Sequence, residues 1–365
     1  MENKIFLENM EPFNDMYFTS CSYSSCLSLV KYYKKDALAI LANPIFNYEF
    51  NEESSIISVR VNEFREIHRI LIDMGISIHL KWPEVDNLKN EIISSLSNGY
   101  PISISIDMYY QPGRIAYYNK EHGLGHQLLV FGYDPDKDMF HTIDDMIGMD
   151  KYTISCKDLE NCYKGMLEGG GFEPGNRCAF FEFRENPDKI LSPLERESAI
   201  YSCIADFTDN MLSRKNLILQ SLNCLCAFEE AFERIKKYET FLESLRSTKD
   251  RRLSESFRFL RMVEHFENDS DIMCTYSKID TLGNEIADHF MQIRNIIARD
   301  VYSNEFSMET SNKSKKIINE IYNKEIQLND ILFSVIDKWK NAEWYNSLRQ
   351  QLPASGAMPF VNAGT

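Results

Sequence analysis

Long apolar runs, paired cysteines and a net positive charge are what this 365-residue sequence lacks. No stretch of 18 consecutive apolar residues occurs, which predicts that the chain does not span a membrane. The nine cysteines are odd in number and show no paired spacing, so we expect reduced thiols in the cytoplasm rather than disulfides. The polar opening, residues 1–4, predicts no secretory signal. A net charge of −15 argues against nucleic acid as a partner.

Proline and glycine are nearly missing from the second half. Between Leu194 and Leu352 the sequence has no proline and one glycine, Gly283. Because helices exclude both residues, this segment is predicted to be almost entirely helical. Apolar residues recur there at helical intervals, as at Leu222, Leu225, Phe232, Ile235 and Leu242. Breaks are expected at residues 247–250, 268–271 and 303–312, which gives four or five long helices, most simply a bundle.

The first half is punctuated differently, with nine of the eleven prolines and twelve of the fifteen glycines before residue 194. Its patterns predict an α+β fold, a leading helix followed by an antiparallel sheet. We therefore expect a first domain over residues 1–188, a helical bundle over 189–352 and a disordered tail over 353–365. Helices are predicted over 21–33, 61–74, 85–97 and 157–164, and strands over 76–80, 102–106, 128–131, 140–143, 151–155 and 178–183.

A histidine and a carboxylate flank one predicted hairpin. Leu128–Phe131 is an uninterrupted apolar run that predicts a buried strand, and 132–137 is rich in Gly, Asp and Pro, which predicts a turn. The returning strand ends at Asp144. The start of one strand and the end of the next lie side by side in an antiparallel pair, so Asp144 is expected to reach the imidazole of His126. This is the base and orienting acid of a nucleophilic triad.

Cys21 is the candidate nucleophile for that pair. It precedes an apolar stretch that predicts a helix, and a thiol at a helix N-terminus has its pKa lowered by the helix dipole. Backbone N–H groups at that end can also hold an oxyanion. A single free cysteine is more often a buried, inert thiol, and Cys26 is expected to face the core in that way. The order Cys, His, Asp favours the catalytic interpretation for Cys21.

These segments resemble a known family. The sequence CSYSSCLSLVKYY from Cys21 is similar to the helix opening of papain-like, bacteriocin-processing-type cysteine peptidases, and HQLLVFGYD from His126 is similar to their histidine strand. A closer resemblance, over roughly residues 10–185, is to the butirosin biosynthesis protein H N-terminal domain family of nonribosomal-peptide gene clusters. It depends on residues 104–110, on His122 followed by His126, and on the stretches 140–144 and 151–164.

The resemblance implies a papain-like cysteine peptidase fold with Cys21 as nucleophile, His126 as base and Asp144 as orienting acid. It implies acyl transfer from a carrier-protein thioester, carried on phosphopantetheine, to an amine in antibiotic biosynthesis, with no resident cofactor and no metal. The sequence departs from the family at Lys34, where a glycine is usual, and at Asp145, which replaces a proline and competes with Asp144. No glutamine precedes Cys21 to complete the oxyanion hole, and Asn14 is the nearest suitable amide.

Four further residues are candidates for substrate binding, each beside a structural alternative. Asp107, at a predicted strand end, is a candidate for holding the ammonium of the incoming amine, or is a surface carboxylate. Tyr109 and Tyr110 are candidates for lining an aromatic channel, although packing is the more common role. His122 lies in a glycine-rich loop, and its alternative is a solvated loop histidine.

The helical half is a candidate for capping the active site, recognising a carrier protein or forming a homodimer. Carrier proteins are acidic, so docking needs a basic patch, and Arg251-Arg252 and Lys313–Lys316 are the candidates. Cys224 and Cys226 form C-x-C with no second pair, so no zinc site is expected. Two other functions remain open: a cysteine peptidase or amidase with the same triad, and an inactive papain-like module that binds partners.

Overall fold

The computed structural model describes residues 4–15, 21–146, 148–169, 180–189, 192–231, 238–266, 270–303 and 307–351. The chain divides into two compact units, Met1–Ala37 with Ile67–Leu191, and Leu38–Glu66 with Ser192–Thr365. The predicted mixture of helices with an antiparallel sheet, followed by a helical C-terminal part, is confirmed. The predicted tail, 353–365, lies outside the described residues. None of the described helices combines the length and apolar character needed to cross a membrane.

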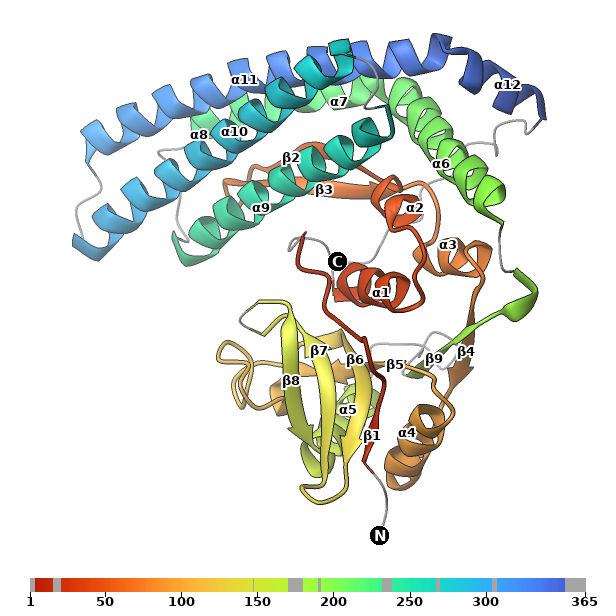
Figure 1. The fold of residues 1–365 in the computed structure, drawn as a ribbon. Helices are drawn as coiled ribbons and strands as arrows, with labels where there is room; N and C mark the ends of the chain where they lie inside the picture. Colours follow the sequence, from red (N-terminus) through yellow and green to blue (C-terminus); the bar gives the residue numbers. More distant parts are fainter. Residues whose placement is uncertain are drawn as a thin grey trace. The chain divides into compact units, whose positions relative to one another are not determined.

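An antiparallel sheet forms the centre of the first unit (Figure 1). Its strands follow the order β4-β9-β5-β6-β7-β8, and β1 pairs with the far end of β6. Gly132 allows that approach, because a Cβ there would lie 3.0 Å from the carbonyl oxygen of Ile5. The strands are β1 (Ile5–Phe6), β4 (Ile76–Lys81), β5 (Ile102–Asp107), β6 (Leu124–Asp134), β7 (Met139–Asp144), β8 (Asp150–Ser155) and β9 (Phe180–Glu185).

Helices cover this sheet. They are α1 (Cys21–Tyr32), α3 (Ile67–Asp73), α4 (Leu88–Ser97) and α5 (Cys156–Glu168). All six residues of β5 are buried, so both of its faces are covered, and α5 and α4 are among the helices that pack on it. The apolar run of β6 follows from this position. The serines of β5 remain satisfied because Gln127 accepts from Ser103 Oγ at 2.7 Å and donates to Ser105 Oγ at 2.6 Å.

Helix α1 ends where the sequence departs from the resembled family. Lys34 N–H donates to the carbonyl of Lys31 at 3.1 Å, and Lys35 N–H donates to that of Val30 at 2.9 Å. This is the Schellman arrangement, which needs a left-handed residue after the helix. Lys34 is that residue, with φ of +53°. A glycine is favoured there because it has no Cβ, and this chain places a lysine in the same conformation.

Helices dominate the second unit, and their bounds confirm some of the predicted helix breaks. Helix α10 begins at Ser270 and α11 at Met308, within the breaks predicted at 268–271 and 303–312, but α9 runs unbroken through the expected break at 247–250. The helices are α2 (Leu38–Leu41), α6 (Pro193–Ser213), α7 (Lys215–Ser221), α8 (Asn223–Ala231), α9 (Tyr238–Val263), α10 (Ser270–Ser303), α11 (Met308–Asn341) and α12 (Glu343–Gln351).

A β-hairpin from the first half of the chain belongs to the second unit. Strands β2 (Pro44–Asn51) and β3 (Ile56–Glu63) pair from Pro44↔Glu63 to Asn51↔Ile56. The helix predicted over 61–74 is therefore wrong at its start, because residues 61–63 are strand and α3 begins only at Ile67. The predicted first domain also included residues 38–66, whereas these residues pack into the helical unit. The division at 191/192 lies within a few residues of the predicted boundary.

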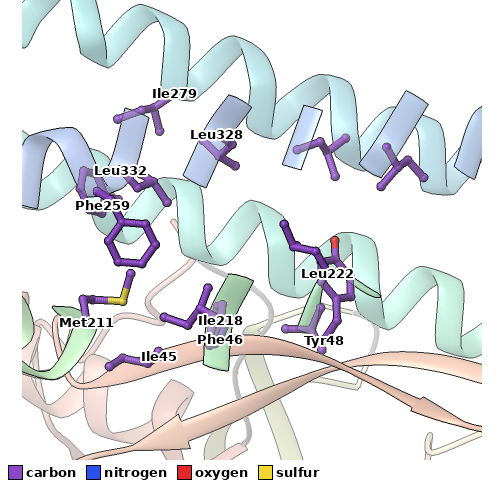
Figure 2. Close-up of a cluster of buried hydrophobic side chains, with 14 of the residues drawn as sticks. Ile45, Phe46, Tyr48, Met211, Ile218, Leu222, Phe259, Ile279, Leu328 and Leu332 are labelled. Atoms are coloured by element: carbon purple, nitrogen blue, oxygen red, sulfur yellow. The ribbon is translucent and has the colours of Figure 1, made fainter. Parts of the chain in front are cut away.

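Side chains from the helices satisfy the outer edges of this hairpin. An isolated two-stranded hairpin leaves N–H and C=O groups unpaired on both edges. Figure 2 shows the apolar contacts that the hairpin makes, with Ile45, Phe46 and Tyr48 beside Ile218, Leu222 and Phe259. The polar contacts along the edges are Tyr48 N to Ser221 Oγ (3.1 Å), Arg258 to the carbonyl of Pro44 (2.6 Å), Arg251 to that of Val59, and Thr248 to that of Ile57 (3.4 Å).

Charged groups are buried beneath the hairpin. Glu325 has no exposed surface, accepts from Tyr48 Oη at 2.6 Å and pairs with Arg252 at 2.8 Å. Arg252 also pairs with Glu255. The prediction that Arg251-Arg252 forms a surface patch for a carrier protein is therefore wrong, because both guanidinium groups are used inside the unit. Lys313 and Lys316 remain exposed.

Candidate active site

His126 and Asp144 lie together on neighbouring strands of the first unit. The register pairs Leu129 of β6 with Ile143 of β7, which brings the start of β6 beside the end of β7 as predicted. The Nε2 atom of His126 is 2.7 Å from Oδ1 of Asp144. The imidazole is 6% exposed and the carboxylate is fully buried. A buried carboxylate bonded to one ring nitrogen fixes the orientation of the ring.

Further donors hold the Asp144 carboxylate. Gln111, itself buried, donates its side-chain amide to Oδ2, and the backbone N–H of Asp145 donates to Oδ1 at 2.7 Å. Burial raises the pKa of Asp144, but the hydrogen bond and charge of His126 and the charge of Arg114 outweigh it and bring the pKa to about 2. Asp144 is therefore ionised at neutral pH and oriented before any ligand binds.

Asp145 lies further from the imidazole than Asp144 does. Its Oδ1 is 3.7 Å from Nε2, beyond hydrogen-bond distance, and its side chain is 40% exposed. Of the two carboxylates that the sequence left in competition, Asp144 contacts the ring. Asp145 instead accepts from Arg114.

Arg114 lies directly against the His126–Asp144 pair. Its Nη2 atom is 2.6 Å from Nε2 of His126 and also contacts Asp144 and Asp145. Its Nε donates to Gln111 Oε1 at 3.1 Å. Burial lowers the pKa of the guanidinium, but the two carboxylates outweigh that effect and raise it. The site therefore contains a permanent cation that the sequence analysis did not anticipate.

The same side chains have the composition of a metal-binding cluster. One ligand atom from each of His126, Asp144 and Asp145 lies within 4.8 Å of the others. The Arg114 guanidinium contacts all three residues, so a cation already neutralises them. A divalent ion would have to displace this guanidinium, and the cluster in this form does not fit one.

The candidate nucleophile is at the first residue of α1, and its side chain lies outside the described residues. Helix α1 packs against β6 and β7, the strands of His126 and Asp144 (Figure 1). Cys26 is buried, as predicted. Asn14, the predicted oxyanion-hole amide, is exposed near the end of the described segment 4–15, so its role stays a prediction.

The four predicted substrate-binding residues form a second cluster, made by Asp107 at the end of β5 and by the loop that follows it. Asp107 is fully buried and accepts from His122 Nδ1 at 2.6 Å and from the backbone N–H groups of Tyr109 and Gly123 at 3.0 and 3.1 Å. It is therefore not a surface carboxylate, which was the structural alternative given by the sequence, and three donors already bind it. The His122 ring stacks on Tyr109 at 4.4 Å, and Tyr110 packs edge-on against Tyr109.

Gln111 and Arg114 are the site residues that sequence reasoning missed. They belong to the segment Gln111-Pro112-Gly113-Arg114, which enters the β5–β6 loop. Periodicity gives no signal in such a loop. The one available signal was the position of these polar residues. They lie around a Pro-Gly turn in the loop that leads to the strand with the candidate base. No family model matches this chain, and no curated protein is significantly similar to it.

Proposed function

We propose that this chain is a cysteine-dependent acyltransferase that forms amides through an acyl intermediate on Cys21. Its donor is an acyl thioester on the phosphopantetheine arm of a carrier protein, and its acceptor is a small amine. The observation that carries the proposal is the buried His126–Asp144 pair, held at 2.7 Å on strands against which α1 packs. The papain-like fold belongs to the same proposal, supported by this helix-on-sheet arrangement and by the family resemblance.

The chemistry proceeds in two displacement steps. His126 removes the proton of the Cys21 thiol, and the thiolate attacks the thioester carbonyl, forming a new thioester on Cys21. The bond to the carrier sulfur breaks, and this sulfur takes the proton back from His126 and leaves as the carrier thiol. The amine nitrogen then attacks the acyl-Cys21 carbonyl. The carbon–sulfur bond breaks, Cys21 leaves as a thiolate, and His126 takes the proton that the amine loses. Asp144 stabilises the imidazolium that forms in each step.

Other cysteines complicate a simple labelling experiment. Burial and the Asp138 carboxylate raise the pKa of Cys156 to about 12, and burial also raises that of Cys162, so both thiols are protonated at neutral pH. Cys226 and Cys274 are exposed and can take adducts without catalysis. An adduct therefore has to be located, and its formation has to depend on His126.

The test is intact-protein mass spectrometry with a panel of simple acyl thioesters, followed by peptide mapping. The wild type and the control Cys274→Ala are expected to gain one acyl group on Cys21, whereas Cys21→Ala and His126→Gln are not. His79→Gln is the matched histidine control, because His79 is an exposed residue of β4 in the same unit. Added amines are then expected to discharge the acyl group as amides.

Each alternative function gives a different result. Discharge by water alone, with cleavage of peptides that lack a thioester, would identify a peptidase or amidase. No acylation by any thioester, with Cys21 alkylated no faster than a free cysteine, would refute the enzyme proposal and favour a binding module. The helical unit would then be the candidate for partner binding or homodimer formation.

A further inference from the structure

Arg114 and Asp144 compete for one ring nitrogen of His126. Nη2 of Arg114 lies 2.6 Å from Nε2, and Oδ1 of Asp144 lies 2.7 Å from the same atom. A guanidinium has only donors, and a carboxylate has only acceptors. Nε2 therefore accepts a hydrogen from Arg114 when it carries none, or donates its own to Asp144, and it cannot do both.

Each contact corresponds to a different tautomer of the neutral ring. With Arg114 on Nε2, the proton of the imidazole is on Nδ1. With Nε2 bonded to Asp144 instead, the proton is on Nε2, and Nδ1 has the lone pair. Because Asp144 and Arg114 both lie on the Nε2 side, the proposed mechanism uses Nδ1 as the base. The first tautomer places a proton on that atom, and the second does not.

We propose that Arg114 controls the protonation site of His126. Its contact with Nε2 holds the ring in the tautomer in which Nδ1 carries the proton and cannot act as a base. Movement of Arg114 towards Asp145 releases Nε2 and produces the active pair. Arg114 is thus a positioning residue that acts through His126. The inference extends the proposed function, since it requires His126 to be the base.

The surroundings of Arg114 allow this movement without dismantling the pair. Asp145 already binds the guanidinium and is 40% exposed, so it can hold Arg114 on the solvent side of the pair. Asp144 keeps its contacts with the Gln111 amide and the Asp145 backbone N–H when Arg114 leaves. Gly113, next to Arg114, has a φ of +91°, and Pro112 precedes it.

The test reads the tautomer directly. Long-range ¹H–¹⁵N spectra of histidine-labelled protein distinguish a protonated ring nitrogen from an unprotonated one, and His126→Gln assigns the signals. The wild type is expected to show a protonated Nδ1, and Arg114→Gln a protonated Nε2. Arg69→Gln is the matched control, because Arg69 pairs with Asp73 on the surface of the same unit. A protonated Nε2 in the wild type, or an unchanged tautomer in Arg114→Gln, would overturn the inference.

Alkylation of Cys21 by iodoacetamide separates this inference from the proposed function. Arg114→Gln is expected to react faster by on the order of tenfold, below the full contribution of a general base. Asp145→Asn removes the carboxylate towards which Arg114 moves. Cys21 in this variant is expected to react more slowly than in the wild type, and this result would support the inference. A changed tautomer with an unchanged alkylation rate would leave the role of Arg114 intact and refute His126 as the base for Cys21.

Discussion

Replacing Gly283 with alanine tests why helices α9 and α10 approach each other closely. A Cβ at Gly283 would lie 2.1 Å from Oγ and 2.8 Å from Cβ of Ser256. Overpacking of this kind costs about 1–3 kcal/mol, and contacts this short favour the upper end. Alanine also improves helix propensity by about 1 kcal/mol over glycine. We therefore expect Gly283→Ala to lower the free energy of unfolding by about 2 kcal/mol.

The two atoms of Ser256 allow a graded test. Ser256 Oγ is buried and has no hydrogen-bond partner among the described residues, so Ser256→Ala loses no bond and removes only the shorter contact. Ser256→Gly removes both contacts. In the Ser256→Gly background, Gly283→Ala is expected to stabilise the protein by about 1 kcal/mol, since only helix propensity remains. The coupling between the two sites is then about 3 kcal/mol.

Urea unfolding followed by helical circular dichroism measures these differences. The parent proteins are the wild type, Ser256→Ala and Ser256→Gly, each with and without Gly283→Ala. The loss of unfolding free energy caused by Gly283→Ala is expected to be largest in the wild type, smaller in Ser256→Ala and smallest in Ser256→Gly. An equal penalty in all three backgrounds, or a stabilising effect in the wild type, would refute close approach to Ser256 as the cause.

Three other predictions concern stability. Lys34→Gly should raise the thermal midpoint, with a gain of about 0.5–1 kcal/mol, because Lys34 is left-handed; a lower midpoint would contradict this. Glu325→Ala should lower the free energy of unfolding in urea by about 3–5 kcal/mol, since it removes a buried partner of Arg252. A loss below 1 kcal/mol would contradict a stabilising role of this ion pair. The pKa of Asp144 is depressed to about 2 from an unfolded value near 3.9, so its contribution, on the order of 2 kcal/mol, is present above pH 4 and lost as the pH falls through 2. Midpoints of the wild type and Asp144→Asn should therefore converge towards pH 2, and a constant gap would exclude this linkage.

Local patterning was sufficient to predict most strands of the first unit. The alternation from Ile102 gives a strand that ends within one residue of β5, and the apolar run before Gly132 marks the middle of β6, which extends further at both ends. The same logic predicted that His126 and Asp144 meet, because hairpin geometry alone brings those ends together. Interactions that depend only on neighbouring segments of chain are those that a sequence reveals directly.

The hairpin of β2 and β3 was missed although a signal was present. Aromatic residues alternate at Phe46, Tyr48 and Phe50, and apolar residues alternate at Ile57, Val59 and Val61. Val61 also fits a helical spacing with the residues that follow, and that pattern was preferred. Membership of the hairpin in the second unit has no local signal, because it depends on helix side chains from far along the chain.

The exposure of the histidine ring distinguishes the two carboxylate–histidine pairs of the first unit. Asp107 and Asp144 are both fully buried and each contacts a histidine nitrogen within 2.7 Å, so a pair of this kind is not by itself evidence of a base. The His122 ring is 58% exposed on a loop, where water competes for its second nitrogen. The His126 ring is 6% exposed and belongs to a sheet strand, with Nη2 of Arg114 2.6 Å from its Nε2 atom. A general base needs a defined tautomer and an environment that excludes competing water, and these requirements favour His126.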